Sequence, residues 1–403
     1  MDGSFVNQIP AQNLSWKEKL FASVLSQIEF GAIDLRFPSG NQVSFVGKDT
    51  SVGTADIHLH SWAAINRIIK GGAIGLGESY MDGEWETQNL TNLLSVLAAN
   101  MMRFEARLPS IKRIKFLEKF RHFLNRNTKS GSRKNISYHY DLGNDFYGLW
   151  LDETMSYSSA VFSEQGASLA EAQTEKYARL ARQLDIQPED KVLEIGCGWG
   201  GFAEYAVTEL GCEIDCITLS QEQLVFAENR LSKIPQGTRA SFSLTDYRDM
   251  TGSYDKIVSI EMLEAVGEAY WPGYFQKVKQ LLKPEGRAGI QVITIDDERF
   301  ETYRKGADFI QKHIFPGGML PSDRVFKQQT ETAGLSCFDE FEFGFDYAQT
   351  LAEWRDSFAA KLSEVKALGF DERFVRMWFF YLAYCEAGFR QKTISVKQYV
   401  IGK

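Results

Sequence analysis

A short apolar run that passes directly into a glycine-rich turn constrains the fold of this chain more than any other feature. Residues 191–201 read KVLEIGCGWGG, and Val192, Leu193 and Ile195 give this segment the pattern of a short buried strand. The turn contains the glycines Gly196, Gly198, Gly200 and Gly201. Glycines let a ligand approach bare backbone and the N-terminus of the next helix. The segment therefore predicts a ligand-binding turn at the end of a strand.

The spacing of these glycines separates two kinds of cofactor. It reads E-x-G-x-G-x-G, whereas a dinucleotide fingerprint reads G-x-G-x-x-G and is followed by an acid about 20 residues later. Glu194, which stands just before the glycines, suits a cofactor that offers an amine or a hydroxyl. We therefore expect S-adenosylmethionine.

The chain from Ile136 onward alternates between helical patterns and short apolar strands, which is typical of a parallel α/β sheet. The expected strands are Lys191–Ile195, Glu213–Thr218, Ala240–Leu244, 255–260, 287–295, 337–343 and 395–401. The expected helices include 221–233, 274–282, 348–367 and 372–389. Ligands bind such sheets at the carboxyl ends of the strands. The glycine turn, Asp246 and residues 261–267 should therefore surround one pocket.

The 403 residues are enough for a second domain with its own core, and residues 1–100 form a separate unit. Strands are expected there at 32–37 and Gln42–Val46, followed by a short helix at 63–70. Residues 75–86 are rich in glycine, acidic and aromatic side chains, and their pattern indicates no chemistry.

Cysteine and histidine are placed in ways that argue against a disulfide framework and a metal site. The five cysteines are scattered without a C-x-x-C pair, and the five histidines do not cluster with carboxylates at ligand spacing. His58 and His60 alternate as on one face of a surface strand. With no signal-peptide pattern and no apolar run of the about 18–20 residues that cross a bilayer, the chain is expected in the cytoplasm.

Basic residues are concentrated in one segment of an otherwise acidic chain. The net charge is −8, yet residues 103–134 contain eleven Lys and Arg against two Glu. Apolar residues recur at helical spacing among them, which predicts a basic amphipathic helix at 101–135 that binds an anionic membrane surface. A helix that packs between two domains explains the same pattern. Nucleic acid is not expected, because no aromatic stacking pattern accompanies the charge.

Several motifs, in order, resemble the cyclopropane-fatty-acyl-phospholipid synthases, a family of S-adenosylmethionine-dependent fatty-acid methyltransferases. They are YHYDLGNDFY (138–147), MSYSSAVF (155–162), LEIGCGWGG (193–201), ITLSQEQ (217–223), LTDYRDM (244–250), EMLEAVGE (261–268), IFPGGMLP (314–321) and the tail 381–390. A weaker likeness extends to GLGESYMDGEW (75–85). The resemblance implies an α/β class I (Rossmann-like) methyltransferase domain at 136–403, with a seven-stranded, mostly parallel sheet. It also implies a smaller N-terminal α+β domain that handles lipid.

The resemblance also assigns cofactor contacts at matching positions. The implied cofactor-binding residues are Tyr138, Gly143, Tyr157, Ser158, Glu194, Gly196, Gly198, Thr218, Leu219, Gln223, Asp246 and Tyr247. Thr218, Leu219 and Gln223 replace the acid that binds ribose in many methyltransferases. Asp246 also reads as half of a solvated ion pair with Arg248.

The reaction that the resemblance implies needs few acids and many aromatic rings. An alkene is a poor nucleophile, so the methyl donor must be held in line with it in a dry site. Methyl transfer leaves a carbocation, which aromatic faces stabilise. The candidate rings, each of which also reads as core, are Tyr157, Phe315, Tyr347 and Tyr381. A base must then remove a proton, and the family uses a bicarbonate ion held by a Cys, a Glu, a His and a Tyr.

The chain departs from the family at two of these four positions. Glu264 and Tyr347 match the Glu and the Tyr, whereas Ser159 stands for the Cys and Gln291 for the His. Both replacements still offer hydrogen bonds to an anion, but they leave open which proton the cation loses. Cys385 matches a cysteine near the acyl pocket and is also explained as a small packed residue.

These observations predict a peripheral enzyme on the inner membrane face that methylates the double bond of phospholipid acyl chains. A cyclopropane product is the main expectation, and a methyl- or methylene-branched chain is the alternative. N-methylation of a small amine, or lipid binding without chemistry, explains part of the pattern. The resemblance suggests a homodimer.

Overall fold

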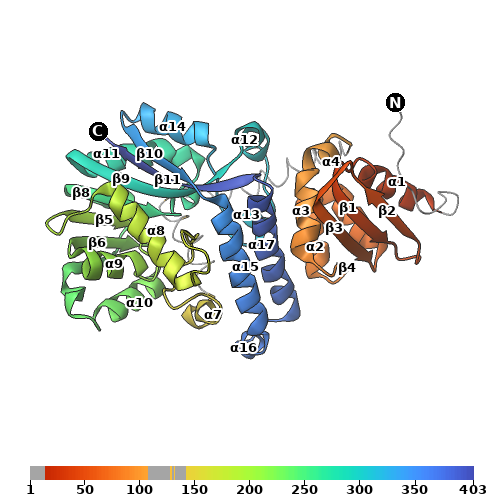
Figure 1. The fold of residues 1–403 in the computed structure, drawn as a ribbon, viewed down its shortest axis with the longest axis horizontal. Helices are drawn as coiled ribbons and strands as arrows, with labels where there is room; N and C mark the ends of the chain where they lie inside the picture. The colour runs from red at the N-terminus through yellow and green to blue at the C-terminus, as the bar shows by residue number, and fades with distance from the viewer. Residues whose placement is uncertain (1–13, 108–127, 129–130, 132–141) are drawn as a thin grey trace.

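The larger of two sheets carries the glycine turn at its centre. The computed structural model describes residues 14–107, 128, 131 and 142–403 (Figure 1). The larger sheet has the strand order β10-β11-β9-β8-β5-β6-β7. Its strands are β5 (Lys191–Ile195), β6 (Glu213–Thr218), β7 (Ala240–Leu244), β8 (Tyr254–Ile260), β9 (Leu282–Ile295), β10 (Ser336–Glu342) and β11 (Ile394–Gly402). β11 pairs antiparallel with β9 and β10, and the other pairs are parallel. The expected seven-stranded, mostly parallel sheet is confirmed.

Helices cover both faces of this sheet and extend from it toward the N-terminal part of the chain (Figure 1). They are α7 (Asn144–Gly148), α8 (Leu169–Leu184), α9 (Gly201–Tyr205), α10 (Gln221–Leu231), α11 (Trp271–Leu281), α12 (Asp297–Tyr303), α13 (Phe309–His313), α14 (Asp323–Thr332), α15 (Gly344–Ala360), α16 (Leu362–Ala367) and α17 (Glu372–Arg390). The single helix expected at 348–367 is two helices, because Lys361 leaves the helical conformation with φ −112° and ψ 18°. We call residues 142–403 the C-terminal unit.

The N-terminal unit, residues 14–107, has its own four-stranded sheet with the order β2-β1-β3-β4. Its strands are β1 (Phe30–Arg36), β2 (Gln42–Val46), β3 (Asp49–Leu59) and β4 (Trp85–Glu86), and its helices are α1 (Trp16–Leu25), α2 (Trp62–Met81), α3 (Leu90–Ala99) and α4 (Met101–Arg107). Helices α2 and α3 lie between this sheet and α17 (Figure 1). The expected small α+β domain is therefore present.

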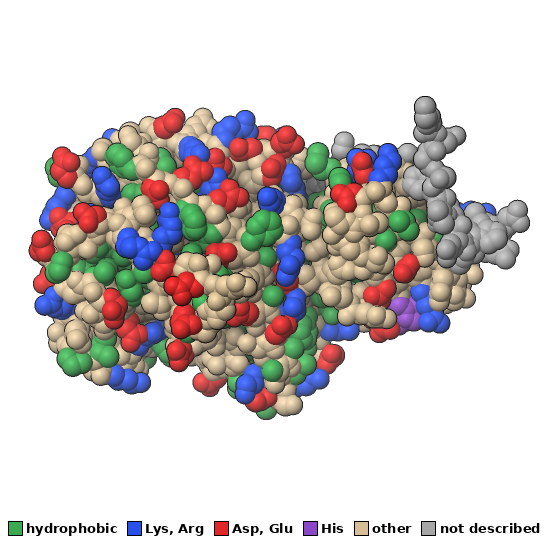
Figure 2. All heavy atoms as spheres, viewed as in Figure 1, with side chains coloured by type: hydrophobic (Ala, Val, Ile, Leu, Met, Phe, Trp, Pro, Cys, Tyr) green, Lys and Arg blue, Asp and Glu red, His purple; other side chains and the backbone are tan. Residues whose placement is uncertain are grey.

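Acidic and basic side chains are intermixed over the face of both units that Figure 2 shows. Most of the basic segment 101–135, with its expected amphipathic helix, lies outside the described residues, and so does Tyr138. In the part of the chain that is described, no helix combines the length and apolar character needed to span a bilayer.

Residues 75–86, for which the sequence indicated no chemistry, dock the two units. Helix α2 has a kink at Gly72, whose φ of 55° and ψ of −132° are not helical, so the short helix expected at 63–70 matches the part before the kink, and a second helical part continues to Met81. A Cβ atom on Gly77 would lie 2.4 Å from the Phe309 ring, so only glycine allows this contact between the units. Glu78 completes the contact through Lys312 Nζ at 2.8 Å and His313 Nε2 at 3.0 Å.

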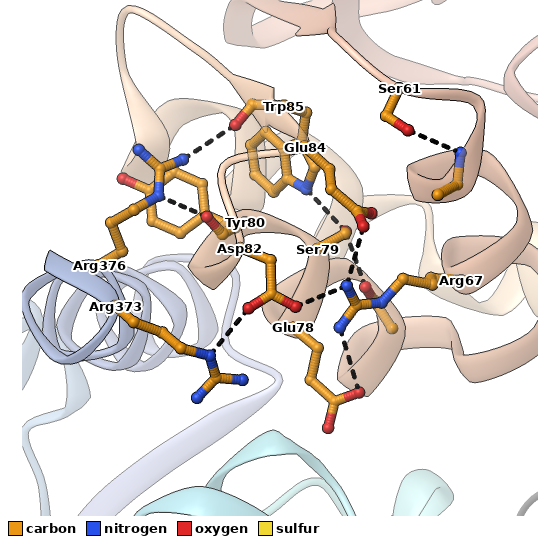
Figure 3. A network of polar contacts seen from close by, with 12 residues as sticks. Ser61, Arg67, Glu78, Ser79, Tyr80, Asp82, Glu84, Trp85, Arg373 and Arg376 are labelled. Atoms are coloured by element: carbon orange, nitrogen blue, oxygen red, sulfur yellow. Dashed lines mark hydrogen bonds and ion pairs between the residues drawn. The ribbon is translucent and has the colours of Figure 1, made fainter.

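A polar network extends this junction along α17 (Figure 3). Asp82 binds Arg67 Nη1 of its own unit at 2.7 Å and Arg373 Nε of α17 at 2.8 Å. Arg376 Nη2 donates to the Trp85 carbonyl at 3.0 Å. The two units are therefore held together by side chains that lie far apart in the sequence.

Candidate active site

A cavity of about 1100 Å³ lies where the N-terminal unit meets the larger sheet. The N-terminal unit lines it with apolar side chains, among them Phe21, Val24, Leu25, Ile57, Leu93 and Leu94. The C-terminal unit contributes Ile293, Phe315, Leu351, Tyr381, Cys385 and Phe389, together with the carboxyl groups of Glu261 and Glu264. Charged side chains such as Lys70, Glu298, Arg299 and Lys305 also border the cavity, but most of its lining is apolar, which suits an apolar ligand.

Glu261 forms the centre of the polar part of this cavity. It follows β8 directly, and its carboxylate accepts hydrogen bonds from Ser159 N–H at 2.9 Å, Gln291 Nε2 at 2.8 Å and Tyr347 OH at 2.7 Å. Its backbone φ is 51°, a left-handed conformation that costs an ordinary residue about 1–2 kcal/mol. Strain of this kind in a cavity wall indicates a functional position.

The amide of Gln291 is held with its NH₂ group toward Glu261. Gln398 Nε2 donates to Gln291 Oε1 at 3.0 Å, and Arg179 Nη1 donates to Gln398 Oε1 at 2.8 Å. These side chains come from α8, β9 and β11, so the sheet and one covering helix fix the whole chain of hydrogen bonds. Because its oxygen is already bonded, Gln291 presents its donor group to an anion.

This arrangement differs from the bicarbonate site that the resemblance implies. Gln291 and Tyr347, two of the expected donors to the anion, both donate to Glu261. The hydroxyl of Ser159 donates to the Ala160 carbonyl at 3.0 Å, so the expected hydrogen bond from this hydroxyl to an anion is not formed. The residues present therefore do not fit a bicarbonate ion, because the carboxylate of Glu261 already uses its donors.

Glu264, the acid expected to hold the base, has a different environment. Ile293 N–H donates to Glu264 Oε1 at 2.6 Å, and Oε2 has no hydrogen-bond partner among the described residues. Burial, and then the charge of Glu261, raises the pKa of Glu264 to about 8. Burial also raises the pKa of Glu261, against the hydrogen bonds that it accepts. The two groups therefore share one negative charge near neutral pH, and Glu261, with three donors, carries it.

The elevated pKa of Glu264 predicts how stability changes with pH. Between pH 4.5, where a free glutamate titrates, and about 8, the folded protein holds a proton that the unfolded chain releases. The folded state must therefore lose stability as pH rises through this window. We expect the free energy of unfolding of the wild type, minus that of Glu264→Gln, to fall between pH 5 and pH 8 in urea titrations. A difference that stays constant would contradict the assignment.

Sequence reasoning missed two buried charged residues, Glu261 and Lys176. For Glu261 the available signal was an acidic residue directly after a buried strand, at the edge where ligands bind. Lys176 lies on α8, where its Nζ donates to Ser158 Oγ at 2.6 Å and to Gln173 Oε1 at 2.5 Å. Burial lowers the pKa of Lys176 to about 8, although Glu261 and other nearby acids oppose the shift. A lysine on an amphipathic helix reads as exposed, so its sequence gave no signal.

Aromatic rings wall the cavity beside the carboxyl pair. The Tyr157 hydroxyl lies 2.7 Å from that of Tyr381, and its ring centroid lies 5.4 Å from that of Trp354 and 6.2 Å from that of Phe315. Cys385 also lines the cavity, and burial raises the pKa of its thiol, which keeps the group neutral. The four candidate rings, Tyr157, Phe315, Tyr347 and Tyr381, are therefore brought together at one end of the cavity.

The glycine turn has the geometry of a backbone cradle. Gly198 has φ 52° and Gly143 has φ 87°, and no described atom lies within 4 Å of where a Cβ would stand on either residue. Glu194 is buried beneath the turn, where the Cys216 thiol donates to its Oε2 at 3.7 Å and burial raises the pKa of Glu194 to about 8. The two open glycines are the feature that fits a cofactor pressed against the backbone.

The remaining expected cofactor contacts follow β6 and β7. They are Thr218, Leu219, Gln223, Asp246 and Tyr247. Thr218 Oγ1 donates to Gln223 Oε1 at 3.0 Å at the start of α10. Asp246 forms a paired contact with Arg248, Nε to Oδ1 at 2.8 Å and Nη2 to Oδ2 at 2.6 Å. Because Asp246 is buried, this pair is not a solvated one.

The open space at Gly198 predicts a loss of cofactor affinity when it is filled. We expect Gly198→Ala to bind S-adenosylhomocysteine about tenfold more weakly, which corresponds to about 1.4 kcal/mol. Titration calorimetry measures this directly. Gly369→Ala is the matched control, because Gly369 also has a positive φ and open space but lies in the loop before α17. Equal affinity in the Gly198 variant would place the cofactor elsewhere.

Comparison with known proteins shows which family the chain resembles. The family model described as mycolic acid cyclopropane synthetase matches residues 127–399. The tuberculostearic acid methyltransferase UfaA1 of Mycobacterium tuberculosis is 41% identical over 367 residues, covering 87% of this chain and 85% of that protein. The cyclopropane-fatty-acyl-phospholipid synthase of Escherichia coli is 35% identical over 350 residues, covering 87% and 88%.

A solved structure shows the same fold with ligands in place. Mycolic acid cyclopropane synthase CmaA1, complexed with SAH and CTAB, aligns with a TM-score of 0.64 at 29% identity. The alignment covers 67% of this chain and 98% of that one. The class I methyltransferase fold is thereby confirmed, and the protein is an S-adenosylmethionine-dependent fatty-acid methyltransferase. The chain belongs to the cyclopropane-fatty-acyl-phospholipid synthase family.

Proposed function

We propose that this enzyme methylates the double bond of an unsaturated phospholipid acyl chain and releases a methylene-branched chain. The observation that carries the proposal is the apolar cavity, which begins among side chains of the N-terminal unit and reaches Glu261 and Glu264. An acyl chain fits such a wall, and a small polar amine does not, which argues against N-methylation. Lipid binding without chemistry leaves the strained, fully hydrogen-bonded Glu261 unexplained.

In this proposal, some residues of the site bind the cofactor, and others stabilise the positive charge or exclude water. Gly143 and Gly198 would hold S-adenosylmethionine, which would supply an electrophilic methyl group. The ring of Tyr157, beside Tyr381, faces the positive charge that develops on the acyl chain. The apolar wall excludes water, which would otherwise trap the cation as an alcohol.

The branched product is preferred over the cyclopropane that the sequence favoured. The relative with 41% identity is named a methyltransferase, whereas the relative named a cyclopropane synthase is 35% identical. The chain also lacks the Cys and His that hold bicarbonate in the synthases it resembles. A cyclopropane is the second candidate, because it forms from the same cation when the transferred methyl group loses a proton before a hydride shifts to the cationic carbon.

The proposal includes roles for the N-terminal unit in handling lipid and for the basic segment in membrane binding. Phe21, Val24 and Leu25 of α1 line the cavity, which supports a lipid-handling role for residues 1–100. The basic segment 101–135 would bind anionic phospholipid at the inner membrane face, and a homodimer is proposed from the family alone. Vesicle binding that requires anionic lipid and weakens with salt would support this docking.

Mass spectrometry of fatty-acid methyl esters tests the activity. The protein is expressed in a host that makes mono-unsaturated phospholipids and lacks a synthase of its own. We expect acyl chains heavier by one CH₂, which then gain two hydrogens on mild hydrogenation because a methylene branch keeps an alkene. A product of the same mass that resists hydrogenation would establish the cyclopropane. No gain of mass would contradict acyl methylation.

A further inference from the structure

Glu261 occupies the centre of the site that the resemblance assigns to a bound anion. Gln291 Nε2 and Tyr347 OH, two of the donors that the resemblance assigns to that anion, and the backbone N–H of Ser159 converge on the two oxygens of Glu261 at 2.7–2.9 Å. A bicarbonate ion also presents a planar group with two oxygen acceptors. The side chain therefore reproduces the charge, the shape and the hydrogen bonds of the ion.

We propose that the carboxylate of Glu261 is the built-in base of this enzyme and takes the place of bicarbonate. This inference rests on the proposed function, because it assigns the proton-accepting step of that reaction. It makes the enzyme independent of dissolved carbon dioxide.

The surroundings of Glu261 keep its carboxylate ready to accept a proton. It borders the cavity together with Glu264, whose remaining oxygen has no partner among the described residues. The backbone of Glu261 is held in a left-handed conformation, which aims the carboxylate at its donors at the end of β8. Arg179, Gln398 and Gln291 form a relay of hydrogen bonds behind it. Position and orientation are therefore fixed by parts of the fold that do not move with the substrate.

The step balances without a further reactant. The alkene π pair forms the new C–C bond as the C–S bond of the methyl donor breaks, and its electron pair stays on sulfur. A 1,2-hydride shift then moves the positive charge onto the carbon that carries the new methyl group. Glu261 accepts a proton from that methyl group, and the C–H pair becomes the C=C bond of the methylene branch. If the methyl group loses its proton before the hydride shifts, the same pair closes a cyclopropane. The proton later leaves Glu261 for solvent.

Two substitutions distinguish a base from a structural acid. Glu261→Gln keeps the shape but cannot accept the proton, and we expect turnover to fall about a thousandfold. Glu261→Gly removes the side chain, relieves the backbone, and frees all three donors for an added ion. We expect its activity to be as low, and to rise at least tenfold with millimolar bicarbonate, whereas Glu261→Gln is not rescued. Glu285→Gln, which changes an exposed acid, is the control.

A binding measurement separates this inference from the proposed function. Line broadening of ¹³C-bicarbonate in NMR reports anion binding without any turnover, and calorimetry with S-adenosylhomocysteine confirms that each variant is folded. We expect bicarbonate to bind Glu261→Gly and not the wild type, whose activity should persist in buffer free of carbon dioxide. Wild-type activity that needs added bicarbonate, or full activity of Glu261→Gln, would overturn the inference. A wild type that methylates no acyl chain would overturn the proposed function, and bicarbonate binding to that wild type would still overturn the inference.

A second and independent site lies on the N-terminal unit, where β4 pairs with β3. The sequence predicted no cluster of histidine with carboxylate, but the register places His58 opposite Glu86, which brings His60 to the same group. His58 Nδ1 lies 3.4 Å from Glu86 Oε1, and His60 Nε2 lies 3.4 Å from Glu86 Oε2. These separations are long for hydrogen bonds. The two contacts run to different oxygens of Glu86, so both histidines face one carboxylate, and imidazole nitrogen and carboxylate oxygen are ordinary zinc ligands.

We infer that His58, His60 and Glu86 form a three-ligand site for a divalent transition-metal ion such as Zn²⁺, with water as the fourth ligand. The three ligand atoms lie within 4.8 Å of one another, and the group is open to solvent. Histidines appear among acidic and basic side chains on the surface of this unit in Figure 2. The ion would link β4 to β3 next to Trp85, whose carbonyl accepts a hydrogen bond from Arg376 of α17.

Zinc titration of the apo protein tests this site. We expect calorimetry to show one equivalent of Zn²⁺ bound, with affinity at least tenfold weaker in His60→Asn and unchanged in His122→Asn. Cys337 is the competing ligand because it is exposed, so Cys337→Ser is measured alongside. The assignment would be overturned if His60→Asn bound zinc as tightly as the wild type, or if Cys337→Ser lost zinc binding.

Discussion

Replacing Glu386 by alanine is expected to lower the free energy of unfolding by about 3 kcal/mol. The side chain is only 2% exposed and joins three elements at the junction of the two units. Its Oε2 binds Arg355 of α15 and accepts from Thr91 Oγ1 of α3 at 3.0 Å, and its Oε1 accepts from Arg390 Nε at 2.9 Å. Removing the acid leaves Arg355 and Thr91 without their shared acceptor, and both lie beside the apolar interface.

Urea unfolding followed by tryptophan fluorescence measures this loss. Asp356→Ala is the control, because Asp356 also pairs with Arg355 but its side chain is 75% exposed. An exposed pair contributes about 0–1 kcal/mol, so this variant should be nearly as stable as the wild type. Equal stability of the two variants would show that Glu386 does not hold the units together.

Replacing Tyr157 by leucine is expected to lower kcat about thirtyfold. The ring stands in the cavity wall near the rings of Trp354 and Phe315, which make its surroundings apolar. A desolvated cation–π contact is worth about 2 kcal/mol, which corresponds to this factor in rate. Leucine keeps the wall apolar, so the cavity should still bind the acyl chain.

Tyr157→Phe separates the ring from the hydroxyl. It retains the aromatic face and loses only the hydrogen bond to Tyr381, so its kcat should stay within a few-fold of the wild type. Steady-state kinetics with saturating lipid and varied S-adenosylmethionine decide between two roles. If Tyr157 instead binds the cofactor, as the resemblance implies, the KM for S-adenosylmethionine will rise in the leucine variant, and kcat at saturation will not change.

β5 and β6 could be predicted from sequence because each is a largely buried, mostly apolar run, whereas β7, at the edge of the sheet and mostly exposed, was placed by the alternation of helices and strands. The bounds of β5, β6 and β7 are confirmed to the residue. The prediction failed where the local pattern was ambiguous. Residues 283–286 read KPEG and resemble a turn, but Pro284 lies within β9, at the irregularity where its pairing with β8 shifts register.

Helix α2 shows why local pattern alone is not enough. Four glycines, Gly71, Gly72, Gly75 and Gly77, disfavour a helix there. The first helical part ends at the kink at Gly72, near the end of the helix expected at 63–70, and a second helical part, which packs against α17 and α13, continues to Met81. Packing against a distant part of the chain thus overrides intrinsic propensity.

The site residues follow the same rule. Residues that the resemblance assigns, such as Glu264, Gln291 and Tyr347, could be named from the sequence, but their hydrogen-bond partners could not. Which carboxylate receives the donors depends on the backbone angle of Glu261, and that angle is set by the end of β8. The group at His58 was missed because its third member, Glu86, comes from another strand.

The cavity wall has a consequence for how this enzyme meets its substrate. Because α1 and α3 supply one side and α17 the other, a bound acyl chain completes the hydrophobic interior and acts as a removable core segment. Ligand that binds only the assembled form stabilises that form by mass action. Substitutions that loosen the α2–α17 junction should therefore appear as a raised KM that grows with chain length, while affinity for S-adenosylhomocysteine stays the same. In this protein, the affinity for the acyl chain and the stability of the contact between the two units therefore depend on each other.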